Sequence, residues 1–286
     1  MLSNPFGILY NPASISNSFQ HIAHEHLYTI DDLVMYDGLY HSMDHHGSYS
    51  GHDPEAVTKG INDSIHRAKS QLVKSAFIFV SLGTSKVYLY KGTGRVAGNN
   101  HKIPHTHFDS HSMSVEECVL ELEKIHRTVK ELSPGAHLIW TVSPIRHLRD
   151  GLVENQRSKA VLILAIEEFI RNQNHTEYFP AYEIMMDQLR DYRFYGRDLV
   201  HPSELAIDII WDLFSRTYLD PHEVEHHLAV EKIKRATEHR FLHNNKTSIK
   251  SFAEAQLRNI DHIAGLFPDM DWKEERQYFF HLIEPD

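Results

Sequence analysis

Apolar and polar residues follow a helical period along much of the chain. Apolar residues recur at three- and four-residue spacing in four segments: about residues 53–72, 114–132, 158–171 and 203–218. Asp53 before Pro54 is an N-cap signal for the first segment, and Ser114 with Glu117 forms a capping box for the second. The pattern predicts four amphipathic helices.

Between these segments lie short runs that are apolar throughout. Residues 76–82 and 137–143 are rich in aromatic and β-branched residues, which is typical of strands buried on both faces of a parallel sheet. A shorter strand is expected near 178–180. Strands alternating with helices predict an α/β fold with a mainly parallel sheet and helices on both sides. Functional loops in such sheets follow the carboxyl ends of the strands.

The pattern changes after Pro221, where no strand is expected. We predict a main domain over residues 1–220 and a C-terminal helical extension over 221–286. Residues 25–52 form a long connection rich in Gly, His and Tyr, which is expected to be irregular and functional.

Composition limits the classes of partner. The formal net charge is −10 and no basic block occurs, so we expect no nucleic-acid partner. No apolar run reaches the roughly 18 residues that span a bilayer, and the N-terminus has no signal-peptide pattern, so we expect a cytoplasmic protein without a membrane partner. A single cysteine, Cys118, excludes an internal disulfide and a zinc site built on cysteines.

Asp198 and His201 are the most informative residues for chemistry. A carboxylate three residues before a histidine can hold the imidazole in one tautomer, and the ring can then act as the base for a serine nucleophile. Such a pair alone is common on protein surfaces. Here it precedes the helix expected at 203–218, on the functional edge of the sheet, but no convincing serine lies upstream of it.

Histidines are numerous, 24 in all, and two groups have ligand-like spacing. They are His41, Asp44, His45 and His46, and separately His101, His105 and His107. Neither group has a second half at the spacing of a metal motif, so we expect no metal and no cofactor. A metal-dependent hydrolase is kept as the least favoured hypothesis.

Eight strings in order carry a resemblance to a known family: Ser3–Pro12, Ser81–Tyr88, Asn99–Lys102, Val142–His147, Ser158–Ala160, Tyr178–Glu183, Leu189–Tyr195 and Asp198–Ser203. Together they resemble the GSCFA-domain family, a bacterial group related to the SGNH (GDSL-like) hydrolases. The resemblance covers about residues 1–220 and, more loosely, the helical tail. It implies a three-layer α/β/α sandwich and a Ser-His-Asp site in which His201 is the base and Asp198 its orienter.

The resemblance also implies further site residues. Gly7 stands where these esterases have an oxyanion glycine. Ser85 occupies the usual position of the oxyanion asparagine, and Asn99 is the candidate replacement because the family's Asn-x-His-Lys string falls on Asn99–Lys102. The expected substrate-binding residues are Gly83, Thr84, His45, His46, Arg146 and His147.

The family's Gly-Ser-Cys-Phe-Ala string, whose serine would be the nucleophile, is expected upstream on a first strand that this chain lacks; Cys118 is not its cysteine. The favoured hypothesis is an ester hydrolase for O-acyl groups on a carbohydrate or other small hydroxylated acceptor. The chain as given is expected to have little activity. The alternative is a non-catalytic SGNH-fold binding module. The acyl group and the oligomeric state are not predicted.

Overall fold

The computed structural model describes residues 2–239, 241, 245–268 and 270–283. The chain divides into two compact units, Met1–Ile210 and Trp211–Asp286. The boundary falls inside helix α6 (Glu204–Tyr218), so this helix ends one unit and begins the next. The expected domain boundary near residue 220 stays a prediction.

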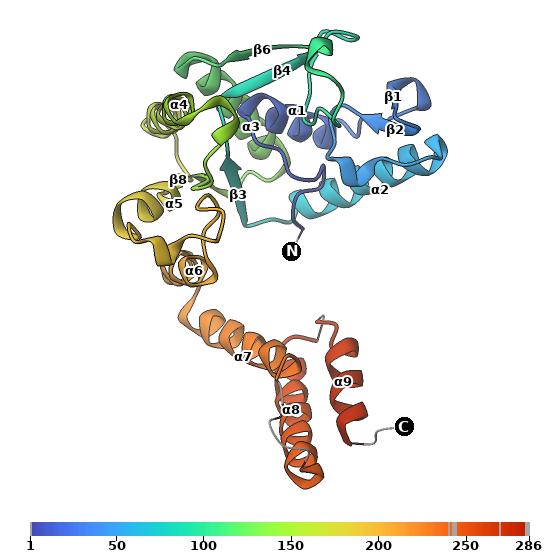
Figure 1. Ribbon diagram of the computed structural model, residues 1–286, viewed down its shortest axis with the longest axis vertical. Coiled ribbons are helices and arrows are strands. Elements are labelled where there is room, and N and C mark those ends of the chain that lie inside the picture. The colour runs from blue at the N-terminus through green and yellow to red at the C-terminus, as the bar shows by residue number, and fades with distance from the viewer. Residues whose placement is uncertain (1, 240, 242–244, 269, 284–286) are drawn as a thin grey trace. The chain divides into compact units, whose positions relative to one another are not determined.

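The first unit is built on a parallel sheet, which confirms the predicted α/β class. Its strands are β3 (Phe77–Leu82), β7 (His137–Val142) and β8 (Thr176–Phe179), in the order β3-β7-β8. Figure 1 labels the two outer strands, β3 and β8. In the parallel register Ile78 lies beside Leu138, which lies beside Thr176. The arrangement is consistent with an α/β/α sandwich.

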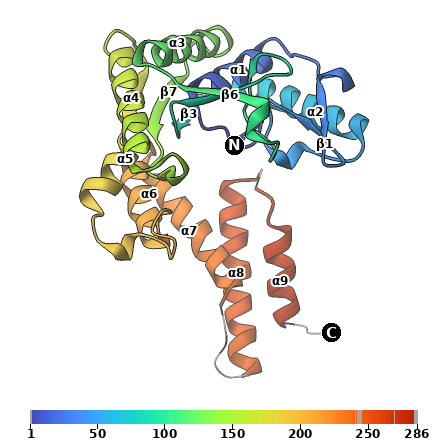
Figure 2. The same ribbon diagram turned by 45° about the horizontal axis from the view of Figure 1, so that its top comes forward.

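The helices of this unit begin at the predicted caps. Helix α2 (Pro54–Leu72) has Asp53 as its N-cap, and α3 (Val115–Leu132) has the Ser114–Glu117 capping box. Helix α4 (Leu152–Ile170) begins earlier than predicted. Helix α3 packs against α4 beside β7 (Figure 2).

Two further helical segments were not predicted. Helix α1 (Pro12–Ala23) is capped by Asn11, whose Oδ1 accepts from Ser14 N at 2.8 Å, and it packs against α3. The short helix α5 (Ala181–Glu183) follows β8 and runs into a π-helical turn, Ile184–Gln188. That turn leads toward the loop containing Asp198 and His201.

The expectation that β3 is buried on both faces is wrong. Ile78, Val80 and Leu82 are buried, whereas the alternate residues Phe77 and Phe79 are 50% and 47% exposed. A continuous apolar run shows only that a strand is apolar, and the number of elements that cover it is decided by the tertiary fold.

Antiparallel strands occur in regions for which the sequence predicts no strand. Residues 25–52, predicted to be irregular, contain the hairpin β1 (Leu33–Tyr36) and β2 (Leu39–Ser42). A second antiparallel sheet, in the order β5-β4-β6, contains β4 (Lys86–Tyr90), β5 (Arg95–Val96) and β6 (Phe108–Ser112).

The second unit is helical over its described residues, as predicted. It contains α7 (Pro221–Thr237), α8 (Lys246–Leu266) and α9 (Lys273–Ile283). Their small core includes Ile233, Ile260, Ile263, Trp272 and Phe279. Across the described part of the chain, no helix combines the length and apolarity that crossing a membrane requires.

Candidate active site

Asp198 and His201 form the acid–histidine pair that the sequence predicts. Asp198 Oδ2 lies 2.6 Å from His201 Nδ1, and its other oxygen accepts from the backbone N–H groups of Val200 and His201 at 2.9 and 3.0 Å. With Nδ1–H directed at the carboxylate, the neutral ring presents Nε2 as an acceptor. Both side chains are more than half exposed, so Nε2 is open to a substrate or nucleophile.

The same contacts keep Asp198 ionised. The backbone N–H of His201, then that of Val200, and then the His201 side chain lower the pKa of this carboxyl to about 2. An ionised carboxylate accepts the Nδ1–H of the ring and so fixes the tautomer in which Nε2 is the acceptor. The pair therefore has the electrostatics of a general base with its orienter.

The loop that carries this pair is closed on itself and tied to the sheet. Gly196 N donates to His201 O at 2.8 Å, and Tyr195 pairs with Pro202 as an antiparallel bridge. Arg146 lies in the loop that follows β7. Its guanidinium donates to Tyr195 Oη at 3.1 Å and lies over the Tyr195 ring.

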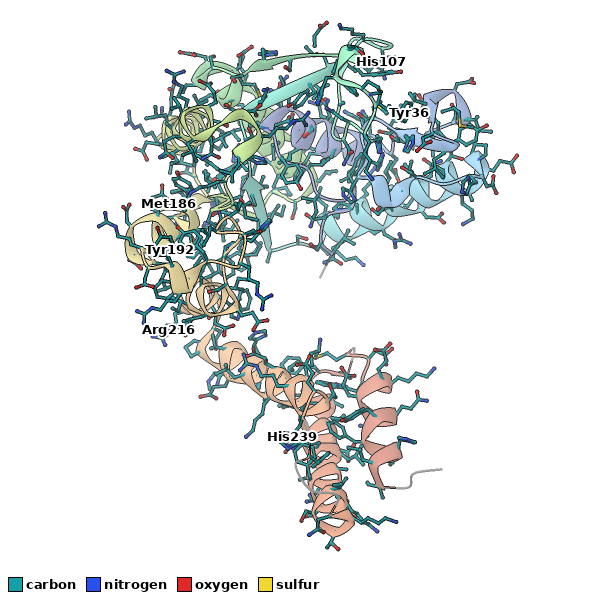
Figure 3. All side chains as sticks on the ribbon, viewed as in Figure 1. Tyr36, His107, Met186, Tyr192, Arg216 and His239 are labelled. Carbon is teal, nitrogen blue, oxygen red and sulfur yellow. The ribbon has the colours of Figure 1, made fainter. Side chains whose placement is uncertain are left out.

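Arg146 also contacts Met186 in the π-helical turn, with Nη2 at 3.4 Å from Sδ. Met186 is labelled in Figure 3. The guanidinium of Arg146 is therefore occupied by protein groups on two segments. Arg146 holds the loop of His201 against the carboxyl end of β7. Its expected role in substrate binding stays a prediction.

One face of α4 fixes the loops at this end of the sheet. Ser158 Oγ accepts from Ser85 N at 2.7 Å and lies 3.0 Å from Thr84 Oγ1. The buried Asn155 accepts from His147 N at 2.8 Å through Oδ1. These residues stand three apart on the helix and so share a face.

The third residue of this face is Lys159, whose side chain is fully buried. Its Nζ donates to Gly83 O and to Ser143 O, each at 2.6 Å. Burial lowers the pKa of Lys159 to about 8. The sequence singles out Lys159 only as part of a family string, because its acceptors lie 76 and 16 residues away, and it carries no signal for Asn155.

The two expected oxyanion residues serve local backbone structure. Gly7 has φ +76°, and its N–H donates to Asn4 O at 2.7 Å. Asn99 Oδ1 accepts from His101 N at 2.8 Å, which is the role of a turn residue. Among the described residues, no hydrogen bond joins either of them to the loop of His201, so their oxyanion role stays a prediction.

The expected substrate-binding residues fall into two groups. Gly83, Thr84, Arg146 and His147 lie together at the carboxyl ends of β3 and β7, where His147 packs edge-on against Tyr10. His45, by contrast, is fully buried and stacks on Phe6 with ring centroids 4.1 Å apart. His46 caps a short turn through Nδ1, which accepts from Ser48 N at 3.2 Å.

A serine–histidine pair lies inside the protein, away from His201. Ser42 Oγ is 2.8 Å from His45 Nδ1, but both residues are buried. Burial lowers the pKa of His45 to about 3, which makes it a poor base at neutral pH. The neighbouring Asp44 accepts instead from Tyr28 Oη at 2.8 Å.

The described residues contain neither a cluster of metal ligands nor a nucleophile bonded to His201. No set of three or more His, Cys, Asp or Glu side chains is arranged to hold a metal ion anywhere in the described ranges. Among those same residues, no hydroxyl or thiol is hydrogen-bonded to His201 Nε2. Cys118 is buried, and burial raises the pKa of its thiol to about 12.

Comparison with known families adds to this geometry. The model of the GSCFA family matches residues 1–214. The chain belongs to the GSCFA family. The model of the GSCFA domain protein C-terminal domain matches residues 230–284, and no curated protein and no solved structure matches. The GSCFA region contains the Asp198–His201 pair and Lys159, and the C-terminal match covers most of the helical unit.

Proposed function

We propose that this GSCFA chain carries the base and orienter of an SGNH-like ester hydrolase, which acts on O-acyl groups of a carbohydrate or other small hydroxylated acceptor. The observation that carries the proposal is the 2.6 Å contact of Asp198 Oδ2 with His201 Nδ1, with Nε2 left open. This is the geometry in which an imidazole takes the proton of an attacking hydroxyl and returns it to the leaving alkoxide.

In this proposal the nucleophile is a serine on a segment N-terminal to Met1, in the string for which the GSCFA family is named. The sheet supports that placement. Strand β3 pairs with β7 along one edge, and no strand among the described residues pairs with its other edge. A strand added there would end at the same edge of the sheet as Gly83 if it ran parallel to β3.

The test compares hydrolysis of acetyl and butyryl aryl esters by this chain and by a form extended to the upstream in-frame start. We expect activity in the extended form only. His201→Ala should reduce kcat by roughly 10²–10⁴-fold, the usual contribution of a general base. Asp198→Asn should act in the same direction because it removes the ionised orienter.

His66→Ala is the matched control, since His66 is another exposed histidine paired with a carboxylate, 3.1 Å from Glu25. It should leave the rate unchanged. If the 286-residue chain is itself active and this activity is lost in His201→Ala, the nucleophile lies within this chain. An extended form whose activity survives His201→Ala would refute the mechanism, and one with no activity would favour the binding module.

A further inference from the structure

Lys159 connects the ends of two neighbouring strands. Gly83 directly follows β3 and Ser143 directly follows β7, and the carbonyl oxygens of both accept from the one ammonium at 2.6 Å. One side chain from α4 therefore joins the carboxyl ends of β3 and β7, in addition to the backbone hydrogen bond from Ser143 N to Leu82 O at 2.8 Å.

The ammonium is buried and has no carboxylate partner among the described residues. Its charge faces Tyr182 of α5, 5.8 Å from the ring centroid, and His147 of the loop after β7. The nearby ions Lys86 and Asp150 pair with each other at 2.6 Å. A buried charge without a counter-ion costs stability, so its presence needs an explanation beyond packing.

Both segments that Lys159 binds lead to other parts of the site. The N–H groups of Gly83 and Thr84 donate to Tyr10 O at 2.7 and 3.1 Å. On the other side, the loop after Ser143 continues to Arg146, which holds Tyr195 at the base of the His201 loop. Lys159 is thus the shared support of the two loops that flank the edge.

We propose that Lys159 is a positioning residue of the candidate active site, whose ammonium fixes the loop after β3 against the loop after β7 and so places His201. The reaction that this placement serves rests on the function proposed above. The placement itself is independent of activity. It can be measured in the 286-residue chain without substrate.

The first experiment is amide hydrogen exchange on wild type and Lys159→Met. We expect protection to fall at least about tenfold at Gly83–Ser85 and Ser143, because one lost hydrogen bond to a charged group corresponds to that factor or more. Lys130→Met is the matched control. Lys130 Nζ also donates to two backbone carbonyls, of Pro134 and Ala136, but near the amino end of β7. It should leave these amides unchanged.

A spectroscopic readout separates positioning of His201 from local support of the sheet. The Cε1–H resonance of the His201 ring should shift in Lys159→Met and stay in place in Lys130→Met. Unchanged protection or an unshifted His201 resonance in a folded Lys159→Met would overturn the proposal. If both the loss of protection and the shift of the His201 resonance are observed but the extended form hydrolyses no ester, only the proposed reaction is contradicted.

If Lys159→Met does not fold, wild type still provides a test. A buried, hydrogen-bonded ammonium exchanges its protons slowly, so the Nζ protons of Lys159 should be visible by NMR at pH 6–7, unlike those of solvent-exposed lysines. Failure to observe them in the folded protein would show that the bridge is not formed.

Discussion

The buried ammonium of Lys159 should make the free energy of unfolding depend on pH in the alkaline range. Burial lowers the pKa of its ammonium in the folded protein to about 8, from an ordinary value of 10.5 that applies to the unfolded chain. Below pH 8 both states hold the proton, and the folded state bears the full desolvation cost. Between pH 8 and 10.5 the unfolded state binds more protons, so the free energy of unfolding gains a positive slope from this group.

The size of this contribution to stability follows from the two pKa values. The gap between 10.5 and about 8 corresponds to about 3 kcal/mol, and no discount for solvent applies because Lys159 is fully buried. Lys159→Met removes the contribution but leaves the carbonyls of Gly83 and Ser143 without a donor, at roughly 1–3 kcal/mol each. Relative to the variant, wild type should therefore gain about 3 kcal/mol between pH 8 and 10.5.

The assay is chemical denaturation of wild type and Lys159→Met at several pH values from 7 to 10.5. Taking the difference between the two proteins cancels the titration of the tyrosines and other lysines. If the difference in the free energy of unfolding between the two proteins changes by less than about 0.5 kcal/mol from pH 7 to 10.5, the reasoning is refuted. Direct titration of the Lys159 side-chain ¹³Cε resonance, with a midpoint near pH 8, provides the independent check.

Three further predictions concern single positions. Gly38→Ala should cost about 1–2 kcal/mol, because φ is +74° there but the space around the new Cβ is open. Gly7→Ala should destabilise clearly more, because φ is +76° and the new Cβ would also lie 2.2 Å from His46 Cβ. Equal urea midpoints for the two variants would contradict the clash. The buried Cys118, with its pKa raised to about 12, should react with a thiol reagent at pH 8 only in denaturant; rapid labelling of the native protein would contradict its burial. Arg146→Ala should lower amide protection at Gly196 by several-fold, whereas Arg149→Ala, at an exposed guanidinium near His105, should not.

The elements predicted correctly from the sequence are those whose signals are local. The caps at Asp53 and Ser114 act within three residues, and the apolar runs of β3 and β7 are continuous. The Asp198–His201 contact also lies within one turn, where Asp198 accepts from the backbone of the residues that follow it. A sequence pattern is sufficient where the interaction closes within a few residues.

The elements that were missed lack a hydrophobic period. Helix α1 buries Ser14, Ser16 and Ser18, and the hydroxyls of Ser14 and Ser18 donate to backbone carbonyls of the same segment. Small polar residues buried in this way give no apolar stripe. Strand β6, Phe108–Ser112, is exposed at all positions but the first, so no alternation identifies it.

Lys159 was missed for a different reason. Its acceptors lie 76 and 16 residues away along the chain, so only the folded sheet brings them to one point. A lysine in an otherwise apolar helix is usually expected to extend to solvent. Nothing in the local sequence distinguishes Lys159 from such a residue.

The chemistry of Lys159 explains why an uncharged or an anionic side chain would serve less well. Methionine would fill a similar volume but has no N–H for the two carbonyls, and a carboxylate would repel them. The low dielectric that makes the buried ammonium costly also leaves its charge poorly screened. Negative charge that develops on an acyl oxygen at this edge would therefore be stabilised by Lys159 without direct contact.

At neutral pH, where relief of desolvation offsets the loss of hydrogen bonds, Lys159→Met in an active extended form should reduce kcat at least tenfold with little change in the free energy of unfolding. Parallel losses of both would show that Lys159 acts through stability alone.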